Sequence, residues 1–422
     1  MLDVKKIIEN PEAVKRALAK RMDIEDMHID EIVELYGQWK EAQQKFEAKR
    51  AEQNELNEKM KALDKNSEEF QNAIRSAKEL SAEVKDLEDD AKLLKDKLTK
   101  LLEVLPNIPK DNVPAGGKEA NTPVKEWGKK PEFDFEIKDH VEIAKNLKMI
   151  DFERGVKMSG NNFVMYKGWG ARLEWALINF FIDEHLKDGF EMILPPHLVT
   201  TESAYTAGQL PKFEEDVFWT TDGRCLVPTA ETALANVYRN EILNAEELPK
   251  KLFAYTPCYR KEAGSYRAGE KGTIRMHQFN KVEMFVYCKP EDSDQILQEL
   301  TRRAEKLVEQ LGLHYRTTLL GAGDCAAGAA ITYDIEAWLP HLQKYYEVSS
   351  ASNVTDYQAR RGNMRYRDRE GNIKFMHTLN SSGLATSRLI VAILETYQQK
   401  DGSLVIPEIL RERVGAEIIK PE

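Results

Sequence analysis

Residues 251–288 read KLFAYTPCYRKEAGSYRAGEKGTIRMHQFNKVEMFVYC, and this stretch decides the fold. Its apolar ends, residues 251–260 and 274–288, predict two strands, and the segment EAGSYRAGEKGT between them predicts a long polar loop. Strands joined as a hairpin pair in antiparallel fashion, whereas parallel strands need helical crossovers. Further along the chain, short β-like runs alternate with amphipathic helices at residues 170–187 and 293–311. We therefore expect an α+β fold built on an antiparallel sheet.

The two predicted strands carry a charged face, because every second side chain of a strand projects to the same side. On the returning strand this face holds Arg275, His277, Phe279, Lys281 and Glu283, and Arg260 and Glu262 lie where the first strand ends. Guanidinium groups bind phosphate, an aromatic ring stacks on a base, and a carboxylate accepts from an amine. The face suits a nucleotide, although a solvated sheet edge would carry similar charges.

Two later segments favour the nucleotide. Residues 345–353, YYEVSSASN, bring the Glu347 carboxylate and the Ser350 hydroxyl within three residues, which suits Mg²⁺ held against a triphosphate. Residues 377–398, HTLNSSGLATSRLIVAILETYQ, predict a strand, a turn through Ser-Ser-Gly at 381–383, and an apolar helix with Arg388 near its start. An arginine placed there can meet a phosphate or cover an adenine ring.

The N-terminal quarter has a different character, since residues 31–105 contain one glycine and no proline. Apolar or small residues recur at three- and four-residue steps from Ile32 to Leu63 and again from Phe70 to Leu105, which is the seam of a coiled coil. The polar break at 64–67 ends in Ser67, a good helix start. We predict an antiparallel hairpin whose arms are each roughly 50 Å long, so the hairpin must project.

Pattern alone leaves the role of this hairpin open between dimerisation, a spacer and RNA binding. It holds 14 Lys and Arg against 18 Asp and Glu, so any RNA contact must use one face, for instance around Lys45, Lys49, Arg50 and Arg75. The 422 residues suggest two or three domains. We expect a helical arm at 1–110 with its coiled coil at about 30–105, a Pro- and Gly-rich linker at 111–130, and a catalytic domain at 131–422.

Composition narrows the class of protein. No run approaches the roughly 18 apolar residues of a membrane span, and the N-terminus lacks the apolar core of a secretory signal, so we expect a cytoplasmic protein with no membrane contact. The four cysteines lie far apart without a C-x-x-C pair, which predicts neither a disulfide framework nor a zinc site. Cys225 and Cys258 are expected to be buried small residues, and His277 and His377 to be structural.

Taken together, these segments resemble the class II aminoacyl-tRNA synthetase motifs in their seryl form. Motif 2 resembles residues 258–285, motif 3 resembles HTLNSSGLATSR at 377–388, and motif 1 resembles GARLEWALINFFIDEH with MILPP. The serine-pocket signature resembles VPTAE at 227–231, and the magnesium strand resembles EVSSASNVTDYQARR at 347–361. The resemblance to bacterial-type seryl-tRNA synthetases covers nearly the whole chain, including the hairpin.

The resemblance implies a role for each matching residue. The catalytic residues would be Arg260, Arg275 and Arg388. Serine would be bound by Thr229, Ala230, Glu231, Glu283, Asn380 and Ser382, and Mg²⁺ by Glu347 and Ser350. ATP would be bound by Arg260, Lys261, Glu262, Met276, Phe279, Glu347, Val348, Ser349, Ser350 and Arg388. No side chain is expected to act as general base or covalent nucleophile.

The family also implies the partners. The hairpin would embrace the long variable arm of tRNA-Ser, tRNA-Sec would be charged too, and two copies would form a homodimer through motif 1. Zinc is not expected, because the zinc-dependent seryl enzymes carry a Cys/His cluster that this chain lacks.

The chain departs from the family pattern in motif 3 and near residue 325. Ser381 and Ser387 replace family glycines, and GDCAAGAAITYD at 323–334 carries small residues where larger apolar ones are usual. An added side chain could crowd ATP, so our hypothesis is that the changes compensate one another. Two rival interpretations remain: a serine-like ligase that loads a carrier protein or small molecule, and a non-catalytic adaptor descended from a synthetase. The long hairpin speaks against the first, and the presence of Arg260, Glu283, Glu347 and Arg388 against the second.

Overall fold

A computed structural model describes residues 1–262 and 272–421 of the chain. Their contacts divide the chain into an N-terminal unit at 2–106 and a larger unit that begins at Asn107. Within the described residues, no helix is both long and apolar enough to cross a membrane.

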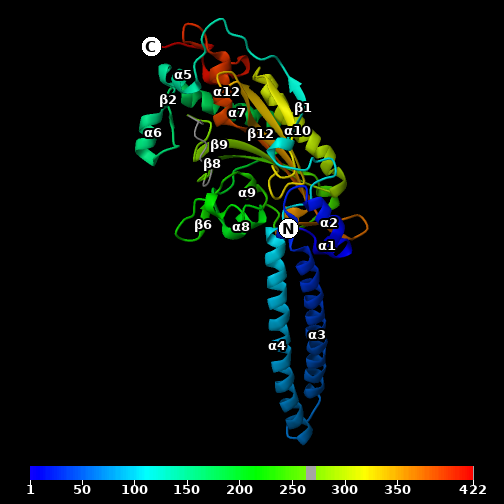
Figure 1. Cartoon of the computed structure of the whole chain (residues 1–422). Helices are drawn as coiled ribbons and strands as arrows, with labels where there is room; N and C mark the ends of the chain where they lie inside the picture. The colour runs from blue at the N-terminus through cyan, green and yellow to red at the C-terminus, as the bar shows by residue number, and fades with distance from the viewer. Residues whose placement is uncertain (263–271, 422) are drawn as a thin grey trace. The chain divides into compact units, whose positions relative to one another are not determined.

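The N-terminal unit is a helical hairpin (Figure 1). Its helices are α1 (Val4–Glu9), α2 (Pro11–Leu18), α3 (Ile29–Lys61) and α4 (Glu68–Val104). The predicted break is confirmed, because Ser67 caps α4 by accepting the backbone N–H of Phe70 at 3.1 Å. Lys49 of α3 pairs with Glu83 of α4 at 3.3 Å, so the two helices lie side by side.

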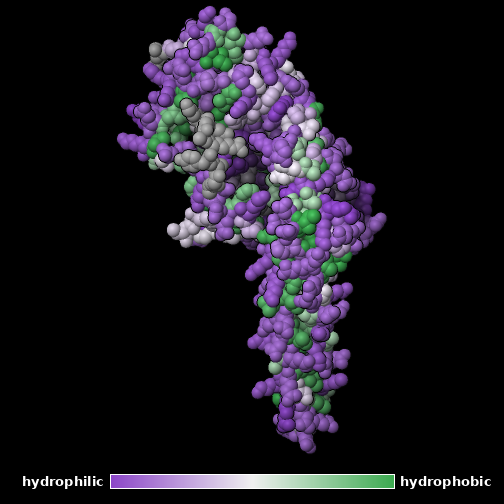
Figure 2. Space-filling model, in the orientation of Figure 1, coloured by the Kyte–Doolittle hydropathy of each residue, from purple (hydrophilic) through white to green (hydrophobic). Residues whose placement is uncertain are grey.

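The predicted seam of the hairpin is confirmed as well. Leu80, Val84, Ala91 and Leu98 of α4 are buried along the hairpin. The surface of the hairpin is mostly hydrophilic, with scattered hydrophobic side chains along its length (Figure 2). Each long helix is therefore stabilised by a narrow apolar stripe against its neighbour rather than by a globular core.

The larger unit is built on one sheet, which confirms the predicted α+β class. Its strands in chain order are β1 (Thr122–Trp127), β4 (Glu191–Ile193), β8 (Lys250–Tyr259), β9 (Gln278–Cys288), β10 (Tyr315–Leu319), β11 (Ile331–Leu339), β12 (Lys344–Thr355) and β15 (His377–Ala385). In space the order is β1-β10-β11-β12-β15-β9-β8-β4. Every neighbouring pair is antiparallel except β4 and β8, at one edge of the sheet.

Helices cover one face of this sheet (Figure 1). The helices of the unit are α5 (His140–Asn146), α6 (Phe152–Ser159), α7 (Trp169–Lys187), α8 (Thr201–Thr206), α9 (Glu231–Leu234), α10 (Ser293–Gln310), α11 (Tyr357–Arg361), α12 (Thr386–Tyr397) and α13 (Arg411–Val414). Small ribbons are formed by β2 (Ile150–Asp151), β3 (Met165–Tyr166), β5 (Leu198–Thr200), β6 (Arg224–Leu226), β7 (Ile242–Asn244), β13 (Arg365–Arg367), β14 (Ile373–Phe375), β16 (Leu404–Val405) and β17 (Ile418–Ile419). The helices α7, α10 and α12 pack on the large sheet and close the main core.

Alternation along the strands separates this core from a polar face. On β9, Val282, Met284 and Val286 enter the main core, and on β15 Leu379 does the same. The alternate side chains of β9 project from the opposite face, where Lys281 and Glu283 are polar and Phe285 and Tyr287 enter a second hydrophobic core. The predicted helices at 170–187 and 293–311 are confirmed to within one residue as α7 and α10.

Three local predictions differ from the structure. The turn predicted at Ser381–Gly383 is wrong, because β15 runs through it: Ser381 pairs with both β12 and β9, Ser382 pairs with β9, and Gly383 lies in a bulge of the strand. The returning strand begins at Gln278 rather than Ile274. The segment expected to be a linker contains β1, which pairs with β10 at the sheet edge. Of the predicted polar loop, residues 263–271 lie outside the described part of the chain.

Candidate active site

A cleft lies on the polar face of the sheet, over β8, β9, β12 and β15. Two larger cavities and a smaller one meet there and share lining residues, among them Arg275 and Glu347. One cavity of about 430 Å³ extends toward α8 and α9, and one of about 570 Å³ extends toward β10 and β11. The motifs, which are far apart in the sequence, thus line one continuous space.

The first cavity contains a half-buried carboxylate held by amides. Glu231 begins α9, and its Oε1 accepts from Gln358 Nε2 at 2.7 Å and from Asn380 Nδ2 at 2.9 Å. Gln358 is fixed in turn by Thr378, whose hydroxyl donates to Gln358 Oε1 at 2.7 Å. Burial, aided by repulsion from Glu283, raises the pKa of Glu231 to about 7. This carboxyl is therefore poised to ionise when a cation enters.

A second carboxylate in the same cavity has a fixed partner. Lys281 pairs with Glu283 at 2.5 Å, and both side chains are buried. Lys281 also donates to Thr229 Oγ1 at 2.7 Å. Around Glu231, the cavity thus offers two carboxylates, Glu231 and Glu283, against the ammonium group of Lys281. The wider lining adds Asp216, Glu262, Glu347, Arg260 and Arg275, and its uncharged hydrogen-bonding groups include Asn380 and Ser382. Such a lining suits a small ligand that carries an ammonium group and a hydroxyl.

Arg260 marks the boundary between the first cavity and the smaller one. Its Nε donates to the backbone oxygen of Pro228 at 3.1 Å, and its guanidinium lies 5.2 Å from the centre of the Phe279 ring. The backbone N–H of Arg260 donates to the backbone oxygen of His277 at 2.9 Å. Both cavities are lined by Arg260, so one guanidinium can face ligands in either of them.

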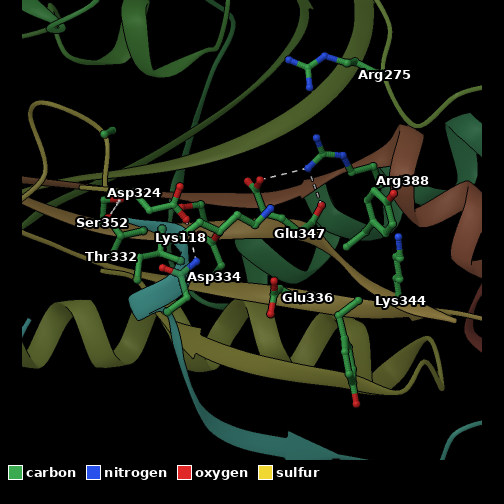
Figure 3. Close-up of a pocket in the computed structure, with 16 residues that line it drawn as sticks. Lys118, Arg275, Asp324, Thr332, Asp334, Glu336, Lys344, Glu347, Ser352 and Arg388 are labelled. Atoms are coloured by element: carbon green, nitrogen blue, oxygen red, sulfur yellow. Dashed lines mark hydrogen bonds and ion pairs between the residues drawn. The ribbon is translucent and has the colours of Figure 1, made fainter. Parts of the chain in front are cut away.

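The smaller cavity lies between β9 and the start of α12 and has an arginine on one side. Arg388 donates from Nη1 to the backbone oxygen of Glu347 at 2.8 Å and approaches Glu347 Oε2 at 3.1 Å. Figure 3 shows this pair at the centre of the cleft. Burial alone would raise the pKa of Glu347, but the guanidinium groups of Arg388 and Arg260 outweigh it and hold the pKa below its usual range.

A further ion pair closes the same cavity. Glu262 and Arg275 contact each other across the end of the hairpin, and Glu262 takes a left-handed backbone conformation with φ of 54°. Met276 and Phe279 supply apolar surface beside them. A flat aromatic base would find a ring, a carboxylate and guanidinium groups within this one space.

The outer cavity holds an acidic residue that the sequence analysis missed. Asp334 of β11 lies opposite Ser350 of β12 in the sheet register, and its Oδ1 is buried without a hydrogen-bond partner among the described residues. Burial and the nearby Glu347 carboxylate raise the pKa of Asp334 well above its usual range. Asp324 and Thr332 line the same cavity (Figure 3). Only the pairing of β11 with β12 reveals this residue, since nothing in the local sequence marks it.

Most of the predicted site residues line the cleft. Those lining it are Thr229, Glu231, Arg260, Glu262, Arg275, Met276, Phe279, Glu283, Glu347, Val348, Ser350, Asn380, Ser382 and Arg388. Three do not: Lys261 is exposed and lies 5.8 Å from the Phe218 ring, Ala230 is buried, and Ser349 donates to the backbone oxygen of Ser382 at 2.5 Å. Sequence reasoning also missed Gln358, which orients Glu231.

The two histidines and two cysteines that the sequence analysis singled out, His277, His377, Cys225 and Cys258, are in structural positions. His277 Nδ1 lies 3.0 Å from the backbone oxygen of Arg260, and His377 Nδ1 lies 3.0 Å from Ser293 Oγ. Cys225 and Cys258 are buried, as predicted. Across the described ranges, no group of three or more His, Cys, Asp or Glu side chains is arranged to hold a metal ion.

Fold and cleft together define the class of protein. The family described as tRNA synthetase class II core domain (G, H, P, S and T) matches residues 218–397. A Giardia lamblia prolyl-tRNA synthetase solved with prolyl-adenylate shares the fold, with a TM-score of 0.58 at 17% identity over 65% of this chain and 56% of that one. The larger unit is a class II aminoacyl-tRNA synthetase core.

Full-length relatives narrow the class to one family. The seryl-tRNA synthetase N-terminal domain family matches residues 1–109. Serine–tRNA ligase 2 of Clostridium acetobutylicum is 51% identical over 98% of this chain and 99% of its own length. The seryl-tRNA synthetase of Pyrococcus horikoshii, solved with ATP, is 37% identical with a TM-score of 0.92 over the whole of both chains. The chain belongs to the seryl-tRNA synthetase family.

Proposed function

We propose that this chain is a serine–tRNA ligase that activates L-serine with ATP and transfers the seryl group to the 3′ end of tRNA-Ser. The observation that carries this proposal is the pocket around Glu231 and Glu283, which opens directly beside Arg260 and the nucleotide cavity. Two ligands bound in these spaces would meet at Arg260. Relatives that match the whole chain carry the name serine–tRNA ligase.

In this proposal the amino-acid pocket binds two groups of serine, its ammonium group and its hydroxyl. Glu231 and Thr229 hold the ammonium group, and Ala230 shapes the wall behind them. Glu283, with Asn380 and Ser382 nearby, reads the hydroxyl. A buried polar pocket of this kind rejects alanine strongly, because alanine lacks the hydroxyl that would bond Glu283 and would leave this carboxylate with Lys281 alone. Threonine must be excluded by size instead.

ATP is the second substrate, and relatives of this chain have been solved with ATP and with AMP. Phe279 would stack beneath the adenine, Glu262 would accept from its amine, and Arg388 would cover the base or hold the γ-phosphate. Arg275 would bind a second phosphate oxygen. Lys261, Met276, Val348 and Ser349 would complete the nucleotide site, although the side chain of Lys261 would have to turn away from Phe218 to reach it.

Glu347 and Ser350 would hold Mg²⁺ at the triphosphate. The residues fit a divalent cation, because Asp334 Oδ1 lies unpartnered in the described structure close to the Glu347 carboxylate, and a cation would relieve their repulsion. A bound Mg²⁺ would neutralise triphosphate charge and orient the phosphates.

Activation of serine requires correct positioning of the two substrates and does not require a general base. The serine carboxylate attacks the α-phosphorus of ATP in line, the bond to the bridging oxygen breaks, and seryl-adenylate and pyrophosphate result. Arg260 lies where it can bind both the carboxylate and the α-phosphate, so it would stabilise the charge that gathers between them. The terminal adenosine of the tRNA then takes the seryl group and releases AMP.

The remaining parts of the proposal concern partners and organisation. Residues 1–110 would form the tRNA-binding arm, with the α3–α4 hairpin against the long variable arm of tRNA-Ser. Residues 111–130 would join this arm to the catalytic domain at 131–422 and would add β1 to the edge of the sheet of that domain. The enzyme would work as a cytoplasmic homodimer and would also charge tRNA-Sec.

Serine-dependent exchange of pyrophosphate into ATP tests the activation step without tRNA. We expect exchange with serine and none with alanine, and we expect Glu283→Ala and Arg388→Ala to lose it. Glu142→Gln is the control, because Glu142 of α5 pairs with Lys138, which precedes the helix, and lines no part of the cleft. Absence of serine-dependent exchange in the unaltered protein would overturn the proposed function.

A further inference from the structure

Helix α7 carries a buried carboxylate that the reaction described above does not use. Glu174 is 5% exposed, and its Oε1 accepts from Asn280 Nδ2 at 2.7 Å and from Thr386 Oγ1 at 2.5 Å. Its Oε2 is buried without a hydrogen-bond partner among the described residues. Donors from two separate elements therefore converge on one carboxylate oxygen, at the cost of leaving the other unpaired.

Both donors lie next to residues that line the nucleotide cavity. Asn280 sits in β9 between Phe279 and Lys281, and because side chains alternate along a strand, it projects to the side of α7 while they face the cleft. Thr386 begins α12 two residues before Arg388. The hydroxyl of Thr386 also lies 3.1 Å from the backbone oxygen of Asn280, so β9 and the start of α12 are joined directly as well as through Glu174.

The chain between these points has a strained backbone. The register of β15 against β9 shifts between Ser382 and Ala385, and within this bulge Leu384 adopts φ of 83°. Positive φ is unfavourable for a branched, non-glycine residue and persists only when the surroundings hold it. Thr386 is the second residue after Leu384, so its hydrogen bond to Glu174 fastens the strained segment at its end.

We propose that Glu174 is a positioning residue for the nucleotide site: it holds the start of α12, and with it Arg388, in register with β9 and therefore with Phe279. This inference rests on the proposed function, in which these two side chains enclose ATP. The residues proposed to hold the serine ammonium, Glu231 and Thr229, have their own hydrogen bonds to Gln358, Asn380 and Lys281. Loss of Glu174 should therefore impair ATP binding and spare serine binding.

Pyrophosphate exchange measured at varied ATP and varied serine tests this inference in the full-length protein. For Glu174→Ala we expect the KM for ATP to rise about tenfold, because a small displacement of Arg388 relative to Phe279 is enough to weaken the binding of ATP between these two side chains. The KM for serine should stay within twofold of the unaltered protein. Glu174→Gln should keep the KM for ATP close to that of the unaltered protein, since the amide oxygen of glutamine can accept the same two hydrogen bonds.

Two further variants separate positioning from general loss of structure. Thr386→Val removes the donor on α12 without changing its size, and it should raise the KM for ATP in the same direction as Glu174→Ala. The effect of the double variant should be smaller than the sum of the two single effects, because both single variants remove the hydrogen bond between Thr386 and Glu174. Glu184→Gln is the matched control: Glu184 is on the same helix and 6% exposed, but it binds Lys187 and Gln310.

Each outcome decides between the alternatives. If the unaltered protein shows serine-dependent exchange and Glu174→Ala leaves the KM for ATP unchanged, or raises both KM values equally, the positioning role is wrong while the proposed function stands. If Glu174→Ala does not fold, Thr386→Val carries the same test alone, and an unchanged KM for ATP in that variant overturns the inference. A rise confined to ATP, rescued by glutamine, supports it.

Discussion

Serine binding should weaken as the pH falls through 7, because Glu231 must be ionised to hold an ammonium group. Burial, with repulsion from Glu283, raises the pKa of Glu231 to about 7 in the ligand-free protein. With that pKa, about nine-tenths of the carboxyl is ionised at pH 8 and about one-tenth at pH 6. The dissociation constant of serine should therefore rise about tenfold from pH 8 to pH 6, a loss of about 1.4 kcal/mol.

The variant Glu231→Gln isolates this carboxyl. Its amide oxygen can still accept from Gln358 and Asn380, as Glu231 Oε1 does, so the pocket keeps its shape while losing the charge. Serine should bind weakly and with no dependence on pH between 6 and 8. The same variant should be more stable than the unaltered protein at pH 8.

The sign of this stability effect follows from proton linkage. The pKa of Glu231 is about 7 in the fold and 4.5 for the ordinary side chain, so the unfolded chain gives up this proton first. Stability is therefore lost as the pH rises from 4.5 through 7, and removing the carboxyl should recover up to about 3 kcal/mol at pH 8. Urea unfolding at pH 8 and at pH 5 measures the difference in unfolding free energy between Glu231→Gln and the unaltered protein. This difference should be smaller at pH 5.

Calorimetric titration with serine at pH 6 and pH 8 provides the binding assay, with Glu184→Gln as control. An equal dissociation constant at the two pH values in the unaltered protein would refute the reasoning. So would a pH dependence that survives in Glu231→Gln, because another group would then control serine binding.

Three further predictions concern the end of β15 and the start of α12. A Cβ on Gly383 would lie 2.1 Å from His185 Nε2, so Gly383→Ala should lower kcat/KM at least about tenfold through overpacking. Adding His185→Ala to this variant should restore part of the lost kcat/KM. If kcat/KM does not recover, a contact other than His185 excludes the alanine side chain. Reverting Ser381 and Ser387 to glycine should leave the KM for ATP almost unchanged. Ser381 is buried outside the cleft lining, whereas Ser387 lines the nucleotide cavity. A large drop in the KM for ATP caused by Ser387→Gly would show that the Ser387 side chain impairs ATP binding in the unaltered protein. Arg388→Lys should raise the KM for ATP about tenfold in pyrophosphate exchange, because lysine cannot bond the Glu347 backbone oxygen and a phosphate in the same planar geometry; an unchanged KM would exclude Arg388 from the nucleotide site.

Features written in local sequence were predictable. The seam of the hairpin, the cap at Ser67, and α7 and α10 follow from spacing and capping, and the structure has them where the pattern places them. Alternation along β9 predicted that Phe279 and Glu283 share a face, and both line the cleft. These are short-range rules, so one stretch of chain suffices to apply them.

Features that depend on which strand lies beside which were not predictable. Ser-Ser-Gly at 381–383 looks like a turn locally but lies in a central strand paired on both sides. Asp334 enters the cleft only because β11 pairs with β12, and Gln358 reaches Glu231 across 127 residues of sequence. Each of these contacts is set by tertiary packing, which overrides local propensity.

Aminoacylation of total bacterial tRNA with labelled serine tests the central claim most directly, with threonine, alanine and glycine run in parallel. Charging with serine alone is the result that we predict, and it would also show that Ser381 and Ser387 are tolerated in motif 3. No charging with any of the four amino acids would contradict the account, and serine-dependent pyrophosphate exchange in that case would point to a ligase with a different acceptor.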